Sequence, residues 1–271
     1  MSKQFKCKIC GYIYKGSAPP ATCPQCKAPA SEFEELSSSL NKNHSAYILV
    51  YTTVIVVVVA LLLSLTSGAL KARQAANIEL DKKKQILSSL PALQLENQDA
   101  AALYEQYVKQ YVILDSAGNV SKTVDDFNYK PNEDELPLYV ASVDGAPKYI
   151  IPLNGVGLWG AIWGYIALNE DKNTVYGIYF SHASETPGLG ANITTSKFQQ
   201  QFAGKHLLRD GAFASIAVMK TGQMADKQEQ VDALSGATIT SKGVETMLKN
   251  CIGRYEAFLK NNTTIQQKEG E

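Results

Sequence analysis

The sequence predicts three parts: a small metal-knuckle module, a single transmembrane helix and a larger α+β domain. Three observations indicate them. Four of the five cysteines form two Cys-x-x-Cys pairs near the N-terminus, residues 46–65 contain no charged side chain, and strand-like segments after residue 92 lead to an amphipathic helix. The expected boundaries are 1–36 for the metal module, 37–45 for a linker, 46–67 for the membrane helix, 68–91 for a helical stalk, 92–260 for the α+β domain and 261–271 for a polar tail.

Composition limits the classes of function. The chain has 271 residues, with 26 basic and 26 acidic side chains, so its charge gives no reason to expect a nucleic-acid partner. Because 45% of the residues are hydrophobic, enough apolar side chains remain to build a core after the membrane segment is set aside.

The uncharged segment 46–65 has the length of a membrane span. A helix rises about 1.5 Å per residue, so about twenty residues cover the roughly 30 Å hydrocarbon core of a bilayer. Tyr47 and Tyr51 lie near one end, and Lys71 and Arg73 follow the other, as expected at lipid interfaces. A buried core helix or strand would be shorter, and a cleaved signal peptide fits poorly because a cysteine module precedes the segment. Membrane lipid is therefore an expected partner.

The cysteine spacing indicates a metal site. The pairs are Cys7-Lys-Ile-Cys10 and Cys23-Pro-Gln-Cys26. Each pair can direct two thiolates at one ion, and two pairs complete a tetrahedral shell of four sulfurs. Clustered pairs of this kind do not form a disulfide framework. Iron and zinc both suit four thiolates, so the residues leave the metal open.

The α+β domain is expected to contain two hairpins, over residues 138–152 and 162–180, each with a polar turn. Further strands are expected at 111–114 and 213–219, and a short helix at 197–202. Apolar residues recur every three or four positions from Val244 to Leu259, which predicts one final helix. Cys251 lies on its apolar face and is interpreted as a buried structural thiol.

The run Gly155-Val-Gly157-Leu-Trp-Gly160 has the spacing of a dinucleotide fingerprint but lacks its context. A fingerprint opens a helix. Here the glycines lead into aromatic and β-branched residues, which predict a strand entering a hairpin. We therefore expect no NADH site in this chain.

A polar loop before the final helix is the candidate site. It reads Ser235-Gly236-Ala237-Thr238, and its small residues leave the Thr238 hydroxyl open. A helix N-terminus favours a phosphate group. Thr240 or Ser241 is expected to cap this helix, and an ordinary capped loop remains an alternative reading of these residues.

This loop resembles the attachment site of covalent FMN-binding domains, in which the flavin phosphate is esterified to the last threonine. Glu185-Thr-Pro-Gly-Leu-Gly190 is a second signature of that family. The resemblance implies an α+β FMN-binding domain with FMN held as a phosphoester on Thr238. It further implies that the surrounding loop and two other segments approach the flavin: Ser235, Gly236, Ala237, Glu185, Thr186, Gly188, Leu189, Gly190, Leu158 and Trp159.

Further motifs narrow the resemblance. Gly157-Leu-Trp-Gly160, Gln201-Phe-Ala-Gly-Lys205 and the single N-terminal helix are similar to the C subunit of the Na⁺-translocating NADH:quinone oxidoreductase. That family implies an electron-carrying flavoprotein subunit of a respiratory complex that passes electrons from NADH to a quinone such as ubiquinone and exports Na⁺. Its implied partners are the other subunits and a flavin transferase. No catalytic residue is expected, because this chain would not be catalytic alone.

The N-terminal module resembles the rubredoxin-like module of rubrerythrins. The similar stretches are Phe5 to Tyr12, Cys23 to Cys26 and Lys27 to Phe33, with Lys27 where glycine is common. The resemblance implies one iron held by Cys7, Cys10, Cys23 and Cys26 and one-electron transfer; a structural zinc ribbon is the alternative. The C subunit of the quinone reductase ordinarily has no such module before its membrane helix.

Two other functions remain open. One is the G subunit of the Rnf ferredoxin:NAD electron-transport complex, which shares the threonine motif. The other is a non-catalytic membrane sensor that binds flavin and zinc. The expected location is the bacterial inner membrane, crossed once. The family resemblance implies a cytoplasmic metal module and a periplasmic FMN domain, whereas the basic residues after the span would place the large domain in the cytoplasm.

Overall fold

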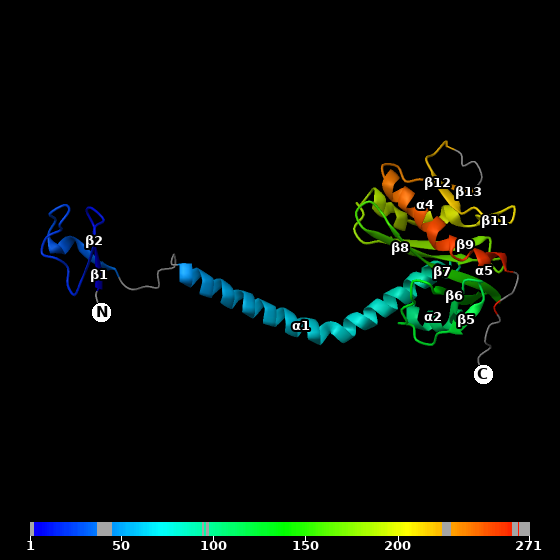
Figure 1. Ribbon diagram of the computed structural model, residues 1–271, viewed down its shortest axis with the longest axis horizontal. Helices are drawn as coiled ribbons and strands as arrows, with labels where there is room; N and C mark the ends of the chain where they lie inside the picture. Colours follow the sequence, from blue (N-terminus) through cyan, green and yellow to red (C-terminus); the bar gives the residue numbers. More distant parts are fainter. Residues whose placement is uncertain are drawn as a thin grey trace. The chain divides into compact units, whose positions relative to one another are not determined.

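The computed structural model describes residues 3–36, 45–93, 95, 98–223, 229–261 and 265. The chain divides into two compact units, Met1–Ala72 and Arg73–Glu271. Figure 1 shows the elements of each unit along the chain.

The N-terminal module is a three-stranded antiparallel sheet. Its strands are β1 (Lys3–Cys7), β2 (Ile13–Gly16) and β3 (Phe33–Leu36), in the order β2-β1-β3, with the 3-10 helix η1 (Ala30–Glu32) before β3. Among the described residues of the module, Cys7, Cys23 and Ala28 form the buried cluster, against which Tyr12 and Phe33 pack. An apolar core this small supplies little folding energy, so a bound metal would contribute much of it.

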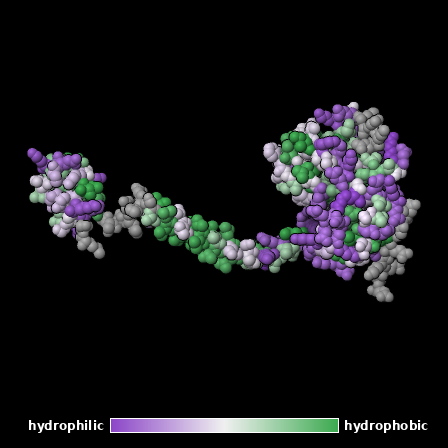
Figure 2. Space-filling view, in the orientation of Figure 1, coloured by the Kyte–Doolittle hydropathy of each residue, from purple (hydrophilic) through white to green (hydrophobic). Residues whose placement is uncertain are grey.

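Helix α1 (Ser45–Ser88) contains the predicted membrane span, 46–67, and continues through the predicted stalk, 68–91, as far as Ser88. Its part Ala46–Ser88 is the one helix in the described residues long and apolar enough to cross a membrane, and the most apolar window has a mean hydropathy of 2.9 with none of it buried. Figure 2 shows the hydrophobic colouring along this segment. Thr52 and Thr66 donate their hydroxyls to carbonyls one turn earlier, which satisfies these polar groups within the helix.

The second unit is built on a six-stranded antiparallel sheet in the order β5-β4-β6-β7-β8-β9. Each strand after β5 pairs with the neighbour given by this order through backbone hydrogen bonds. The strands are β4 (Val108–Leu114), β5 (Val120–Thr123), β6 (Leu136–Val143), β7 (Ala146–Val156), β8 (Ala161–Leu168) and β9 (Val175–His182).

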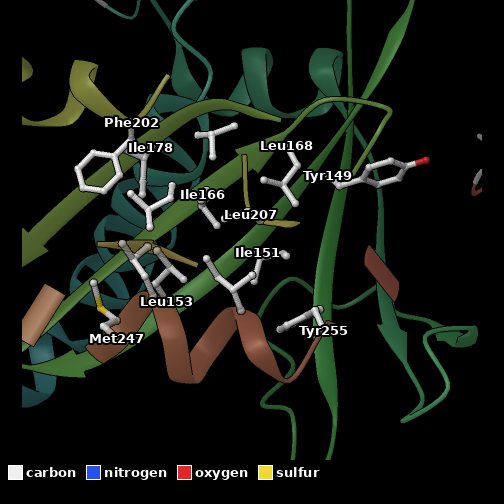
Figure 3. Packing of buried hydrophobic residues seen from close by; sticks show 14 of the residues in the cluster. Tyr149, Ile151, Leu153, Ile166, Leu168, Ile178, Phe202, Leu207, Met247 and Tyr255 are labelled. Carbon is white, nitrogen blue, oxygen red and sulfur yellow. The ribbon is translucent and has the colours of Figure 1, made fainter. Parts of the chain in front are cut away.

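One face of this sheet carries the main core. Helix α4 (Thr238–Gly253) packs on it, and Met247 of α4 lies beside Leu153 of the sheet (Figure 3). Smaller elements complete the layer: η2 (Gly190–Thr194), α3 (Ser196–Gln199), η3 (Gln200–Phe202), β10 (Leu208–Arg209), β11 (Ala212–Phe213), β12 (Ile216–Met219), β13 (Glu229–Asp232) and α5 (Glu256–Lys260).

The opposite face of the sheet is covered by the end of α1 and by α2 (Ala100–Tyr107). Ile86 and Leu87 are fully buried there. Tyr111 and Tyr139 stack with ring centroids 4.5 Å apart. Both faces of the sheet are therefore covered, and residues of alternate parity along each strand point to the two cores.

The structure confirms both predicted hairpins, which correspond to β6–β7 and β8–β9. The prediction of one strand over 213–219 is wrong: β11 and β12 are separate, with Ser215 between them at a φ of 61°. The final helix is interrupted, because α4 ends at Gly253 and α5 begins at Glu256. Five elements described in the second unit had no predicted counterpart: α2, β5, η2, β10 and β13.

Candidate functional site

The four cysteine sulfurs of the N-terminal module converge, and all lie within 4.8 Å of one another. The sulfurs of Cys7 and Cys26 are 3.6 Å apart, and those of Cys10 and Cys23 are 3.5 Å apart. A regular tetrahedron with metal–sulfur bonds of about 2.3 Å has edges of about 3.8 Å. The arrangement therefore fits one tetrahedral metal ion.

The two Cys-x-x-Cys turns repeat one backbone pattern. The backbone N–H of Cys7 donates to the carbonyl of Tyr12, and the backbone N–H of Cys23 donates to the carbonyl of Ala28. The residue after each pair, Gly11 or Lys27, has a left-handed backbone, with φ of 77° and 58°. Lys27 thus adopts the conformation that glycine favours at the matching position of the first turn.

Backbone donors, burial and the neighbouring sulfurs together set the acidity of the thiols. Burial raises the pKa of Cys23, but the N–H groups of Cys26 and Gln25 lower it to about 7 in sum. For Cys26 the N–H of Ala28 acts in the same direction, yet burial and the other sulfurs raise its pKa to about 12. A cation bound by all four sulfurs would offset this mutual repulsion.

Thr238 is the first residue of α4, and it is exposed. The residue before it, Ala237, makes no side-chain capping bond, so the helix N-terminus is open. The expectation that Thr240 or Ser241 caps the helix is wrong. Both lie inside the helix: the Thr240 hydroxyl donates to Glu185 Oε2 at 2.6 Å, and Ser241 Oγ accepts from the Leu234 N–H.

A groove of about 580 Å³ runs beside Thr238, between the first turns of α4 and the end of β7. Gly243 allows this approach, since a Cβ there would lie 2.4 Å from the carbonyl oxygen of Val156. The groove is lined by Asn154, Gly155, Val156, Gly157, Thr238, Ile239, Lys242, Gly243, Thr246, Met247 and Asn250.

Exposed apolar side chains line this groove, at Val156 and Ile239, and occur in the chain segments next to its lining residues. Figure 2 shows a hydrophobic patch over the N-terminal end of α4. Val156 is 74% exposed and Trp159 is 67% exposed. Exposed apolar side chains that lie together, unlike scattered ones, mark binding surfaces. Leu158, Leu189 and Ile239 are also exposed.

The Gly155–Gly160 motif forms the β7–β8 turn, closed by a bond of 2.8 Å from Gly157 N–H to the Gly160 carbonyl. The hairpin interpretation of this motif is confirmed. A Cβ at Gly157 would lie 2.5 Å from Glu185 Oε1, so this glycine makes room for the protein's own carboxylate.

Glu185 itself is buried, with 4% of its surface exposed. Its side chain is directed into the protein, which differs from the expectation that it approaches a flavin. Thr186, Gly188 and Leu189 of the same segment are exposed, and Gly190 is buried. His182 accepts the Glu185 N–H on Nδ1 at 3.2 Å.

The predicted site residues do not all share one cavity. Ser235 lines a second groove, of about 700 Å³, which Lys197 and Asp232 also line. Lys242, Thr246 and Asn250 were not predicted as site residues. The sequence could have predicted them, because positions 238, 242, 246 and 250 recur every four residues and therefore share one face of the helix that begins at Thr238. Cys251 is partly buried, and its thiol donates to the Asn154 carbonyl at 3.2 Å.

Comparison with known proteins identifies relatives of both units. Residues 157–253 match the FMN-binding domain family, and residues 5–34 match the rubredoxin-like domain of rubrerythrin. The chain is 30% identical to the C subunit of the Na⁺-translocating NADH-quinone reductase of Pseudomonas aeruginosa, over 82% of this chain and 97% of that protein. It is 28% identical to the corresponding protein of Haemophilus ducreyi, over 80% and 93%.

Solved structures show the same fold. The crystal structure of the C subunit of this reductase from Parabacteroides distasonis is 41% identical and covers 72% of this chain and 98% of its own, with a TM-score of 0.68. The NqrC protein of Shewanella oneidensis, at 23% identity, covers 68% and 99% with a TM-score of 0.58, which supports the fold alone.

Proposed function

Because the chain belongs to the NqrC family, the C subunits of the Na⁺-translocating NADH-quinone reductase, we propose that it carries electrons within such a membrane complex, on FMN attached to Thr238. The observation that carries this proposal is the exposed Thr238 hydroxyl on an uncapped helix N-terminus, beside a groove with an apolar rim. Electrons would enter the complex from NADH on a partner subunit and leave on a quinone, with Na⁺ exported.

Covalent attachment requires an activated donor, because a phosphate monoester does not esterify an alcohol unaided. A flavin pyrophosphate, supplied with a transferase, meets this need. The Thr238 oxygen would form a bond to the phosphorus next to the flavin, the P–O–P bond would break, and a nucleotide monophosphate would leave with the bonding electrons. The hydroxyl proton would pass to a base of the transferase. On this chain the helix N-terminus favours the phosphate charge.

The residues around Thr238 fit this group. Lys242 lies one turn further along the same face and lines the groove, where its ammonium is paired with Glu245 Oε1 at 2.6 Å. The partial positive charge of the helix N-terminus is therefore the main attraction for a phosphate on Thr238. Leu158 and Trp159 offer apolar surface of the kind that a flavin ring can cover. Bound FMN would supply the one- and two-electron chemistry, and the protein would hold and orient it.

For the N-terminal module we propose one iron on Cys7, Cys10, Cys23 and Cys26, with one-electron transfer as its role. The close sulfurs and the rubredoxin-like match support it. Metal analysis of the purified chain from iron-replete cells should give about one iron per chain, with a colour that dithionite bleaches. A chain that contains only zinc would contradict iron and favour a structural role.

The proposed orientation has the metal module in the cytoplasm and the flavin domain outside. Reducing conditions in the cytoplasm keep four thiols available for metal loading. If the two sites lie across the roughly 30 Å bilayer core, transfer between them needs cofactors on partner subunits.

The functional test uses membranes that contain the whole complex. Thr238→Val removes the attachment oxygen and keeps the side-chain shape, so Na⁺-dependent quinone reduction by NADH should be lost. Thr123→Val is the matched control, because Thr123 is an exposed threonine on the edge strand β5 and lines neither groove. Full activity of the Thr238→Val complex would refute the proposal.

A further inference from the structure

One carboxylate joins three segments around the attachment site. Glu185 Oε1 accepts the backbone N–H of Trp159 at 2.8 Å, and Oε2 accepts the Thr240 hydroxyl at 2.6 Å. Trp159 belongs to the β7–β8 turn, Thr240 to the first turn of α4, and Glu185 to the loop after β9. These segments are far apart in the sequence, so the carboxylate is a direct link between the apolar side of the site and the helix that begins with Thr238.

Two glycines make space for this link. A Cβ at Gly190 would lie 2.4 Å from Glu185 Oε2 and 2.6 Å from the Thr240 hydroxyl oxygen. A Cβ at Gly157 would lie 2.5 Å from Glu185 Oε1. Real side chains do not make such contacts. The segments 155–160 and 185–190 therefore each have a glycine, Gly157 and Gly190, where the chain packs against the buried carboxylate of Glu185.

The charge of Glu185 is held by neutral donors. No ion pair found in the described residues includes it. Burial raises the pKa of this carboxyl, but the Thr240 hydroxyl and the N–H groups of Trp159, Leu158 and Gly160 lower it below its ordinary value in sum. Bonds to an ionised acceptor are shorter and stronger than neutral ones, so the link is rigid.

Resting on the proposed attachment of FMN to Thr238, we propose that Glu185 is a positioning residue. Through Thr240 and the Trp159 N–H it fixes how the Thr238 hydroxyl stands relative to the apolar wall of the site. It does not touch the flavin, since its carboxylate is buried among protein groups. Its role is to present the hydroxyl for attachment and to limit the motion of the attached group.

The hydrogen bond between Glu185 and helix α4 can be removed with little change in side-chain shape. Thr240→Val removes the hydroxyl that Glu185 accepts, and Thr240→Ser restores it. Glu185→Gln keeps the size but replaces charge-assisted bonds by neutral ones. Glu135→Gln is the matched control: Glu135 also accepts a backbone N–H and a hydroxyl, from Asn132 and Tyr129, but lies outside the attachment site.

The experiment follows flavin loading of the full-length chain in detergent, with purified transferase, by intact-mass spectrometry. Misplacement of a reacting group by about 1 Å costs up to about a hundredfold in rate. We expect Thr240→Val and Glu185→Gln to load about tenfold or more slowly, with lower turnover but an unchanged KM of the transferase for the chain. Thr240→Ser and Glu135→Gln should load like the unaltered chain.

A second readout separates positioning from mere folding. In the loaded fraction, the fluorescence anisotropy of the flavin should fall in Thr240→Val and recover in Thr240→Ser. Wild-type loading and anisotropy in Thr240→Val, or equal defects in Thr240→Val and Thr240→Ser, would overturn the proposal. The two Thr240 variants decide the question even if Glu185→Gln fails to fold. Attached flavin in Thr238→Val would instead refute the attachment site and leave the Glu185 result unexplained.

Discussion

Lys27 shows how one residue can depart from the conformation its side chain prefers. It has a φ of 58°, at the position matching Gly11 of the first Cys-x-x-Cys turn. A non-glycine residue in the left-handed region costs roughly 1–2 kcal/mol. The metal-binding turn imposes this conformation, because the Lys27 N–H donates to the carbonyl of Cys23.

Lys27→Gly should therefore stabilise the metal module by up to about 1 kcal/mol, since relief of strain exceeds the added chain entropy. The measurement is the thermal loss of the metal–thiolate absorbance, which reports this module within the full chain. Gly11→Ala is the converse control, since its Cβ would meet no close contact, and it should lower the midpoint. A lower midpoint for Lys27→Gly would show that the lysine side chain makes a contribution larger than the strain.

At the scale of elements, the end of α1 is part of the core of the second unit. Ile86 is fully buried, whereas Ile78 on the same helix is 69% exposed. Ile86→Ala should destabilise the second unit by about 2–5 kcal/mol, and Ile78→Ala should change stability by less than about 0.5 kcal/mol. Chemical unfolding followed by near-UV signals of the aromatic core measures both. Equal effects would contradict the packing of α1 on the sheet.

The loop between β5 and β6 contains an acid-sensitive cluster. The Lys122 ammonium, the Asn132 N–H and the Tyr129 hydroxyl lower the pKa of Glu135 from its ordinary 4.5 to about 2. A lowered folded-state pKa adds stability above pH 4.5, which is lost as the pH falls toward 2. Glu135→Gln should flatten the pH dependence of the unfolding midpoint in this window, because it lowers the midpoint above pH 4.5 and changes it little near pH 2. If the pH dependence of the midpoint is the same in Glu135→Gln and in the unaltered chain, the ionisation of Glu135 does not contribute to stability.

Local signals predicted the hairpins. Asp144-Gly145 joins β6 and β7 with φ of 51° and 78°, which is the geometry an Asp-Gly turn favours. The metal site was equally readable, because both of its turns are local. The sequence did not predict that the side chain of Glu185 points into the protein. Its partners Trp159 and Thr240 lie 26 and 55 positions away, and a single sequence does not tell which distant donors meet a carboxylate. The true role of Gly157 and Gly190 depends on the same contact.

At the scale of the whole molecule, charge and family indicate opposite orientations. Basic residues follow the span closely, including Lys71 and Arg73. However, long domains cross the membrane largely regardless of flanking charge. Alkaline phosphatase fused after Lys260 should therefore be active in cells, and a cytoplasmic reporter at the same point should be silent. The reverse pair of results would place the flavin domain in the cytoplasm.

The central claim is that one hydroxyl, that of Thr238, carries the flavin. Intact-mass spectrometry of the denatured full-length chain, produced with the flavin transferase, tests it most directly. The unaltered chain and the Thr123→Val control should each gain the mass of FMN minus one water, and Thr238→Val should gain nothing while it remains folded. Flavin mass retained on Thr238→Val, or lost from Thr123→Val, would contradict the account.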